Sequence, residues 1–367
     1  MALKFTHDRA VYVSCFLKES DYDTAETVEA ASGSTLVEFE GGSINYAHTR
    51  RDGVGEGNEF GSNGFVSRKD YTVSLTFPYL RPNDMAFLAA YSLGSSSATK
   101  DGAYAAYRHA ATLVSTESIP TFSMVVSEAG LQKVLTGCAI NTCTISRNGD
   151  YWQGTVEIIG TRAATNADSF PAEIAEEPLL YGNTSVWYET GADTDIAATP
   201  VQGSENLSAG TPDNIKADIV SGPTITINNN LRNDRGYDAS NSNDVMCKGQ
   251  LHRGAKREVT VEWVQTFEAD GYLTDFEGTA NVQEHSAIEI NCKETAQGVI
   301  ATSGAMYYGF IFILPRANLD VIGEAGDDDG IVTRSLKLTA KTPTAADEGS
   351  TDVVQWFTYN GQADYAG

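Results

Sequence analysis

The chain has 367 residues, 41% of them hydrophobic and 10% aromatic, which is enough apolar material for one large domain or two smaller ones. Its 49 acidic residues outnumber its 25 lysines and arginines, and the formal net charge is −24. Such a surface repels phosphate backbones and anionic lipids, so a protein that grips nucleic acid or a membrane is disfavoured. Solubility or a saline habitat would favour the same charge.

The cysteines and the start of the chain bear on its compartment. Five cysteines, at positions 15, 138, 143, 247 and 292, form neither a disulfide framework nor a CxxC metal motif. Residues 1–9 carry no apolar segment typical of a secretion signal, and no run of 18 apolar residues occurs. We therefore expect a protein without a membrane anchor, made in a reducing cytoplasm.

The first half predicts an N-terminal arm followed by strands and a helix. Residues 1–35 are the arm, and residues 36–165 form the first β domain. A strand candidate over 36–46 leads into a glycine-rich stretch, 47–64, which we expect to be a loop. The next segment alternates polar and apolar residues strictly from Tyr71 to Phe77, as a strand with one buried face does.

Residues 82–93 predict the helix. Pro82 suits a first turn, Asp84 suits the positive end of a helix, and Gly94 suits the position just after it. Its apolar residues surround the helix axis, which predicts burial on more than one side. Two interpretations stay open: either Phe87, Leu88 and Tyr91 contact a neighbouring subunit, or the helix is buried wholly within its own domain.

Residues 135–160 predict a hairpin, because Asn148-Gly149 is a strong turn signal between two alternating segments. A polar stretch, 166–178, is the expected linker between domains. The second β domain, 179–367, contains an insertion near 191–214 that is rich in Asp, Thr, Gly and Ala. Its role is left open.

The second half is organised around two alternating strands, 224–231 and 257–263, joined by a long polar loop. Further strands are expected over 287–293, 305–314, 331–341 and 353–359. The two halves also share a pattern. Ser43-Ile44-Asn45 corresponds to Thr226-Ile227-Asn228, Val73 corresponds to Val259, and the hairpin at 135–160 corresponds to residues 311–341.

These segments resemble a known family. Residues 177–187, the strand Thr226-Ile227-Asn228-Asn229-Asn230-Leu231 and the stretch 253–261 look like the tail tube protein of long-tailed bacteriophages. Residues 135–145 and Phe312-Ile313-Leu314-Pro315-Arg316 resemble the hairpins of the same family, and the insertion departs from its pattern. The resemblance covers most of residues 36–342 and is carried by the order and spacing of the motifs.

The resemblance implies a mainly β protein of two tandem tail-tube-like β-barrel or sandwich units, each with long hairpins and at least one flanking helix. Such units assemble into stacked six-fold rings around a lumen. With two units in one chain, we expect three chains to form a pseudo-hexameric ring. The implied location is the virion tail, and the implied partners are the chain itself, the tape measure protein, the tail tip or baseplate and the tail terminator, with double-stranded DNA passing through unbound.

A conduit for DNA needs a polar or acidic wall, because each phosphate neutralised by Lys or Arg adds sequence-independent affinity. The polar faces of the alternating strands are the candidate wall, although they could equally face outward: Thr72, Ser74, Thr76, Thr155, Glu157, Glu258, Thr260, Glu262, Thr333 and Ser335. Lys337 on the same face departs from a purely acidic wall. The long loops could order against the next ring, with Arg50, Arg51, Asp52, Arg232, Asp234 and Arg235 as candidate contacts.

The sequence shows little sign of a catalytic or metal-binding motif. Its five histidines have no partner at a spacing such as HExxH, and neither a P-loop nor a GxSxG motif occurs. Asp327-Asp328-Asp329-Gly330 lacks the spacing of a calcium-binding loop. We expect a structural protein without catalysis, metal or cofactor. The alternative is a β-sandwich surface or carbohydrate-binding module, which would stay monomeric.

Overall fold

The computed structural model describes most of the chain, with gaps. The described residues are 9–13, 19–20, 35–37, 41–53, 62–113, 119–128, 131–160, 162–165, 176–190, 200–207, 212–232, 251–266, 285–323, 326–328, 331–342 and 352–363.

The described residues of the first half form ten strands and one helix. In chain order they are β1 (Arg9–Val13), β2 (Thr35–Val37), β3 (Gly41–Gly53), β4 (Ser62–Phe77), α1 (Pro82–Leu93), β5 (Gly94–Lys100), β6 (Tyr107–Leu113), β7 (Phe122–Glu128), β8 (Leu131–Asn148), β9 (Tyr151–Gly160) and β10 (Arg162–Thr165).

In the part of the second half that the structure describes, there are eleven strands and three short 3-10 turns. The strands are β11 (Thr184–Thr190), β12 (Asp213–Asn214), β13 (Ile219–Asn228), β14 (Leu231–Arg232), β15 (His252–Arg253), β16 (Glu258–Thr266), β17 (Ser286–Val299), β18 (Tyr307–Ile322), β19 (Gly326–Asp328), β20 (Ile331–Ala340) and β21 (Gln355–Asn360). The 3-10 turns are Tyr181–Asn183, Ile215–Ala217 and Ile300–Thr302. The expected mainly β fold is confirmed.

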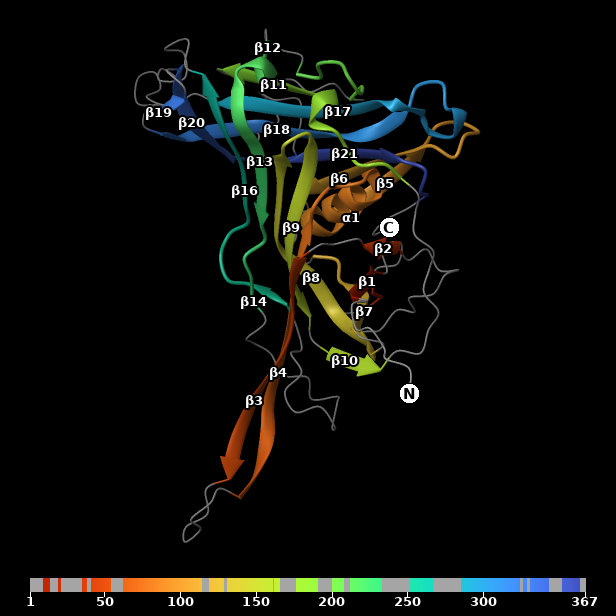
Figure 1. The fold of residues 1–367 in the computed structure, drawn as a ribbon, viewed down its shortest axis with the longest axis vertical. Coiled ribbons are helices and arrows are strands. Elements are labelled where there is room, and N and C mark those ends of the chain that lie inside the picture. Colours follow the sequence, from red (N-terminus) through yellow and green to blue (C-terminus); the bar gives the residue numbers. More distant parts are fainter. Residues whose placement is uncertain are drawn as a thin grey trace.

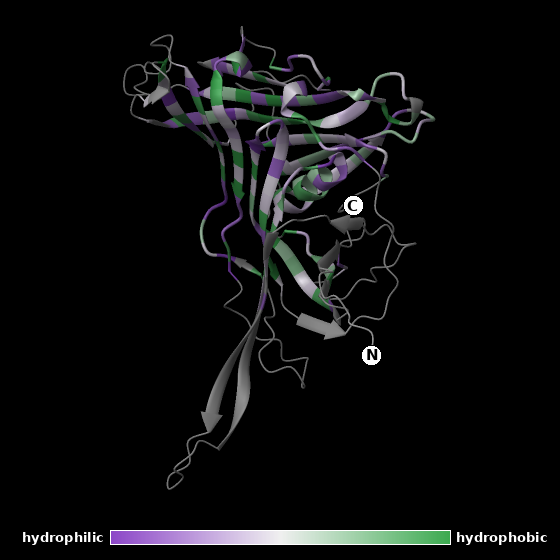
Figure 2. Ribbon diagram, viewed as in Figure 1, coloured by the Kyte–Doolittle hydropathy of each residue, from purple (hydrophilic) through white to green (hydrophobic). Residues whose placement is uncertain are grey.

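One antiparallel sheet runs through both halves of the chain, and we call it the main sheet (Figure 1). Its strands follow the order β3-β4-β9-β8-β13-β16-β20, and the second part of β18 pairs beyond β20. The β8–β13 pairing joins the halves directly. The hydrophilic and hydrophobic residues alternate along β13 and β16 (Figure 2), which places one face of the sheet in the core and leaves the other polar.

A second sheet lies across the end of the main sheet. Its order is β12-β11-β17-β18-β21-β6-β5, and its strands cross those of the main sheet in Figure 1. The long strand β18 belongs to both sheets. A smaller group, β2-β1-β7-β8-β10, uses the first part of β8.

The expected helix is confirmed at the predicted residues. Asp84 accepts a hydrogen bond from the backbone N–H of Arg81 at 3.1 Å, and Gly94 ends the helix with φ 111°. The helix packs against β8 on one side and against β21 and β6 on another. Residues of the second half also cap it, because Asn229 Nδ2 donates to Ser92 O at 3.0 Å and Arg257 Nη1 donates to Leu93 O at 2.9 Å.

The hydrophobic core is shared between the halves. One cluster of buried side chains includes Phe77, Leu88 and Trp152 from the first half and Trp263 and Phe310 from the second. The rings of Trp152 and Phe310 lie edge to face, 5.2 Å apart between centroids. The expected division into 36–165 and 179–367 therefore does not correspond to two separate cores in the described residues.

The two halves nevertheless pair their strands in the same way. The set β3-β4-β9-β8 and the set β13-β16-β20-β18 have the same order when each is read from its first strand. Ile44 pairs with Val73, and Ile227 pairs with Val259, which are the positions that the sequence pattern matched. The expected correspondence between residues 135–160 and 311–341 also agrees with this order, because the β8–β9 pair of the first half matches the β18–β20 pair of the second.

Two expectations need correction or lie outside the described residues. Residues 47–53 and 62–64 were expected in a loop, but they lie in β3 and β4, which form a two-stranded ribbon that projects from the body (Figure 1). Pairing between the two strands satisfies the backbone hydrogen-bonding groups of these residues, although their polar, glycine-rich composition is typical of a loop.

The described residues contain one α-helix, whereas a helix was expected in each half. Residues 267–284, which follow β16 as α1 follows β4, lie outside the described part.

Part of the insertion is docked against the body. Residues 200–207 lie on β17 and β18: Gln202 Nε2 donates to Tyr307 O at 2.8 Å, and Asn206 Nδ2 donates to Glu289 Oε1 at 2.6 Å. Tyr359 on β21 donates its hydroxyl to Pro200 O at 3.2 Å. This segment therefore covers one face of the second sheet. Residues 191–199 and 208–211 of the insertion lie outside the described residues, as does most of the linker, 166–175.

Candidate functional site

The candidate site is the polar face of the main sheet, where register places most of the predicted residues in rows. The clearest row contains one threonine from each of six neighbouring strands, every one directly opposite the next. The six are Thr76 on β4, Thr155 on β9, Thr144 on β8, Thr226 on β13, Thr260 on β16 and Thr339 on β20. β-branched residues suit a pleated surface, and their hydroxyls offer hydrogen bonds without a fixed charge.

Acidic residues lie in the adjacent row. Ser74 is opposite Glu157, and Glu157 is opposite Thr142; on the other side of Thr142, Asn228 is opposite Glu258. Both glutamates are exposed. This row therefore carries two carboxylates and three neutral polar side chains, and it presents a negative surface.

The row on the other side of the threonines contains an ion pair. Ser146 is opposite Thr224, Thr224 is opposite Glu262, and Glu262 is opposite Lys337. Lys337 Nζ lies 3.0 Å from Glu262 Oε1. The hydrogen bond to Glu262, together with the negative charges of Glu262, Glu258 and Asp320, raises the pKa of Lys337. Because both side chains are partly exposed, the pair contributes little to stability, but it neutralises the cation on this face.

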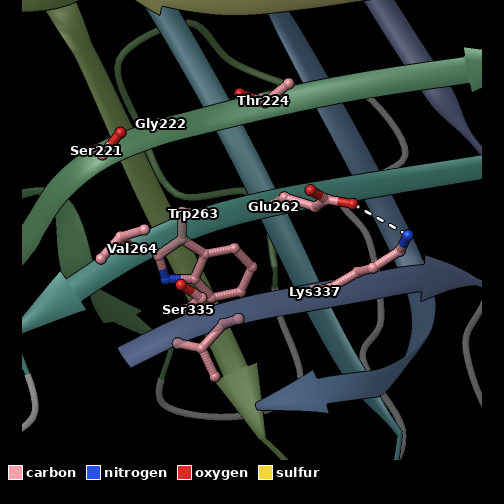
Figure 3. Close-up of a pocket in the computed structure, with 9 residues that line it drawn as sticks. Ser221, Gly222, Thr224, Glu262, Trp263, Val264, Ser335 and Lys337 are labelled. Atoms are coloured by element: carbon pink, nitrogen blue, oxygen red, sulfur yellow. Dashed lines mark ion pairs between the residues drawn. The ribbon is translucent and has the colours of Figure 1, made fainter. Parts of the chain in front are cut away.

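A shallow pocket opens on the same face, beside the irregular start of β13 (Figure 3). Its volume is about 300 Å³. Ser221 and Gly222 line it from β13, Trp263 and Val264 from β16, and the Glu262–Lys337 pair lies along one side. The Trp263 indole N–H donates to Gln265 Oε1 at 2.6 Å, so its polar atom is already satisfied. The lining contains a paired acid and base and the three hydroxyls of Ser221, Thr224 and Ser335, with no histidine or cysteine.

The predicted wall residues are not equally accessible. Thr72, Thr155, Glu157, Glu258, Glu262 and Ser335 are exposed, and Ser74 and Thr76 are half-buried. Thr260 and Thr333 are only 4% and 7% exposed, so these two residues lie on the predicted face but offer little surface. Thr333 is enclosed because β20 is flanked there by β16 and β19.

The helix residues are buried within the chain itself. Phe87, Leu88 and Tyr91 are at most 1% exposed, and the rings of Phe87 and Tyr91 both pack against Phe122. None of the three is available to a neighbouring subunit. The helix is thus buried inside the chain, but not wholly within its own domain as the other interpretation held, because β21 and residues of the second half also cover it.

The predicted loop contacts fall in strands or outside the described residues. Arg50, Arg51 and Asp52 lie on β3, within the projecting ribbon, and Arg232 lies on β14 and is exposed. Asp234 and Arg235 lie outside the described part of the chain. The residues that can be placed thus belong to two ribbons, β3–β4 and β14–β15, rather than to irregular loops.

Sequence reasoning missed half of the polar face. Thr142, Thr144 and Ser146 on β8, with Thr224 and Thr226 on β13, complete the rows. The alternation of β8 and β13 was visible in the sequence, but the pairing of these two strands across the halves was not. That pairing turns two separate polar faces into one.

Within the described residues, no group of three or more His, Cys, Asp or Glu side chains could hold a metal ion. Cys138, Cys143 and Cys292 are buried, and burial raises the pKa of the Cys143 thiol to about 12. Among the described helices, none combines the length and apolar character required to cross a bilayer.

Comparison with known proteins adds no identification. No family model matches the chain, and no curated protein matches it.

Proposed function

We propose that this chain is a tail tube subunit: a structural virion protein that assembles into stacked rings and forms a polar conduit for a phage genome. The observation that carries the proposal is the polar face of the main sheet, which continues without interruption across two strand sets of the same order. In this proposal each strand set is one tube unit, and three chains supply the six units of a ring.

The chemistry of the polar face suits passage of DNA without retention. Duplex DNA presents one negative charge per about 1.7 Å of axis, and a basic wall would bind it at many points. The rows instead carry neutral threonines and the carboxylates of Glu157, Glu258 and Glu262, while Lys337 is paired with Glu262. A wall of this composition attracts few phosphates and remains hydrated.

The ends of the main sheet supply the means of ring closure. In the described residues, β3 pairs only with β4, so its outer edge carries unpaired backbone groups. Such edges pair with other chains, and heterologous pairing around an axis generates closed rings. In the proposal β3 of one chain pairs with the far edge of the neighbouring chain's main sheet. The tape measure, tail tip or baseplate and terminator proteins are the proposed further partners in the virion.

The projecting β3–β4 ribbon supports a role in assembly. Within the described part of the chain, residues 62–70 of β4 pair only with β3, and at about 3.3 Å per residue they extend roughly 30 Å beyond the strands that support the rest of β4. An isolated two-stranded ribbon is marginally stable in water. Contact with another subunit would stabilise it, which fits a protein that works in a stack.

Negative-stain electron microscopy of the purified chain, combined with mass measurement in the same buffer, tests the proposal. We expect rings or hollow tubes and a ring mass of three chains. Hexamers of whole chains would keep the tube but contradict two units per chain. A stable monomer at high concentration that protects a glycan ligand would instead support the carbohydrate-binding alternative.

A further inference from the structure

Tyr181 lies where three segments that are separate in the sequence meet. It begins the 3-10 turn Tyr181–Asn183, and its backbone N–H donates to Asp150 O in the β8–β9 turn at 2.8 Å. The next 3-10 turn along the chain joins the group, because Lys216 Nζ donates to Gly182 O at 2.6 Å. The β8–β9 turn of the first half and two turns of the second half therefore surround this tyrosine.

Two cations lie over the ring of Tyr181. The guanidinium carbon of Arg147 is 4.4 Å from the ring centroid, and Lys216 Nζ is 5.5 Å from it. Each cation also donates to one carbonyl group, Arg147 Nε to Gly149 O at 3.0 Å and Lys216 Nζ to Gly182 O. A guanidinium has five N–H donors and an ammonium has three. Both side chains are half-buried, and the described residues leave most of their donors without an acceptor.

The chain does not neutralise these two cations. Within the part that the structure describes, no carboxylate lies within ion-pair distance of Arg147 or Lys216. Glu294, the buried acid beside this turn, instead accepts hydrogen bonds from Leu180 N and Asn183 Nδ2. Like charges repel more strongly where water is partly excluded, so two half-buried cations close together favour an anion between them.

The titration of Lys216 reflects this repulsion. Burial lowers the pKa of Lys216, Cys292 acts in the opposite direction, and the charge of Arg147 lowers the pKa again. The neighbouring aspartates do not contribute to this shift, although they belong to the same segments: Asp150, Asp213 and Asp218. A bound anion would favour the charged form of Lys216 and offset both unfavourable causes.

The hydroxyl of Tyr181 supplies a third donor. Tyr181 is 6% exposed, and among the described residues no acceptor lies within hydrogen-bond distance of its buried hydroxyl. Burial raises the pKa of the phenol; Arg147 opposes this through its charge and as a hydrogen-bond donor, but a guanidinium has no acceptor for the phenolic proton. A buried O–H group without an acceptor, beside two cations, points to a ligand that carries negatively charged oxygens.

We propose that Arg147, Lys216 and Tyr181 form a binding site for a phosphate group. A guanidinium donates parallel hydrogen bonds to two phosphate oxygens, an ammonium binds as a point charge, and the phenol donates one more hydrogen bond. Gly182 leaves room beside the site, because a β-carbon there would meet no atom within 4 Å. This site goes beyond the proposed function and does not depend on assembly.

A phosphate group at this site would hold the β8–β9 turn and the two 3-10 turns together. These three segments come together only in the folded chain, so the ligand would bind the folded state and not the unfolded one. A ligand of that kind stabilises the folded state in proportion to the logarithm of its concentration. Phosphate should therefore raise the temperature of unfolding.

Titration of the purified chain with inorganic phosphate, followed by calorimetry and by thermal unfolding, tests the site. Chloride at the same ionic strength is the reference, because it screens charge equally but offers no set of oxygens. The variants Arg147→Gln, Lys216→Gln and Tyr181→Phe each remove one donor group. Lys293→Gln is the matched control, since Lys293 is half-buried and its Nζ lies 4.4 Å from the ring centroid of Tyr307.

We expect phosphate to raise the unfolding midpoint of the wild type by about 2 °C more than chloride does. Arg147→Gln and Lys216→Gln should weaken phosphate binding about tenfold or more, and Tyr181→Phe about fivefold, because each removes a hydrogen bond to a charged group. Lys293→Gln should bind as the wild type does. Without phosphate, Tyr181→Phe should unfold at the wild-type temperature or above it, because it removes a buried hydroxyl that has no acceptor.

Two results would overturn the site. One is a wild-type midpoint that rises equally in phosphate and in chloride. The other is a loss of phosphate binding in Lys293→Gln as large as that in Arg147→Gln, which would show that general charge and not this site attracts the anion.

A second titration, with a short DNA duplex, identifies the source of the phosphate. Binding of inorganic phosphate without binding of the duplex supports a site for a free anion. Binding of the duplex by the wild type, lost in Arg147→Gln and kept in Lys293→Gln, supports the same phosphate site but assigns it to nucleic acid. That second result would also contradict the passage of DNA without retention, so it separates this site from the proposed function.

Discussion

Glu176 lies against the start of α1, where its carboxylate accepts a hydrogen bond from Asn83 N at 2.7 Å. Burial, together with the nearby charge of Asp84, raises its pKa to about 7, although the hydrogen bond and Arg81 act in the opposite direction. The folded chain therefore holds the proton of Glu176 more tightly than the unfolded chain does. This residue joins the end of the 166–178 stretch to the helix.

Stability should depend on the ionisation of Glu176. Because its folded pKa is about 7 and the ordinary value is 4.5, the free energy of unfolding should fall as the pH rises from about 4.5 to 7 and should level off above that. Glu176→Gln should remove on the order of 2 kcal/mol of this fall. Denaturant unfolding at several pH values measures it, with the exposed neighbour Glu177→Gln as control. An unchanged profile in Glu176→Gln would contradict the assignment.

Asn206 holds the docked part of the insertion through a buried carboxylate. Its side chain donates to Glu289 Oε1, which is fully buried, and its Oδ1 accepts from Val201 N at 2.6 Å. Asn206→Ala should lower the free energy of unfolding by about 2 kcal/mol, because it leaves Glu289 short of a donor in the interior. Protease sensitivity near residues 200–207 should rise. The exposed Asn214→Ala is the control, and equal losses in both variants would argue against this anchor.

At the scale of elements, Gly309 permits β17 and β18 to approach each other. Its φ is +149°, and a β-carbon there would lie 2.1 Å from Cys292 O. Gly309→Ala should cost about 3 kcal/mol or more, because the clashing atom is backbone and the conformation is disfavoured for an L side chain. Thermal unfolding measures the loss. Gly182→Ala, where nothing lies within 4 Å, should change little; a similar loss in both would show that Gly309 has no special role.

The sequence predicted elements well where the signal is local. Proline, acid and glycine at the ends of an uncharged segment identified α1, and alternation from Tyr71 to Phe77 identified which residues of β4 face the core. It failed for residues 47–53, because their glycine and arginine content outweighed a pairing with β4 that only the fold reveals. Burial of Phe87 and Tyr91 by Phe122 is also a long-range fact that periodicity could not assign.

The same limit applies to the candidate site. Thr76, Thr155 and Thr260 could be assigned to polar faces from alternation alone, but their common row depends on the β8–β13 pairing between residues about 80 apart in the chain. Register of that kind is set by packing of both halves around one core. The sequence therefore predicted the chemistry of the face but not its extent.

At the scale of the whole molecule, the shared core predicts that the halves depend on each other. Trp152 packs on Phe310, its indole N–H donates to Thr184 Oγ1 at 3.0 Å, and Arg257 and Asn229 cap α1. The full chain should unfold in one cooperative transition. Fragments 1–165 and 179–367 should each lack a cooperative thermal transition when produced alone, as followed by circular dichroism. Two separate fragments that each melt cooperatively would contradict a single core.

The two ribbons differ in sequence and in the extent that the structure describes. The β3–β4 pairing continues from Gly53 and Ser62 to the body, whereas β14 and β15 contribute two residues each to the described part of the second ribbon. A ring of three chains would then alternate two unlike ribbons. Image averaging with imposed sixfold symmetry would superpose unlike features and blur them, while threefold averaging would sharpen both. Whether threefold or sixfold averaging gives the sharper image therefore tests whether a ring contains three chains of two unlike units.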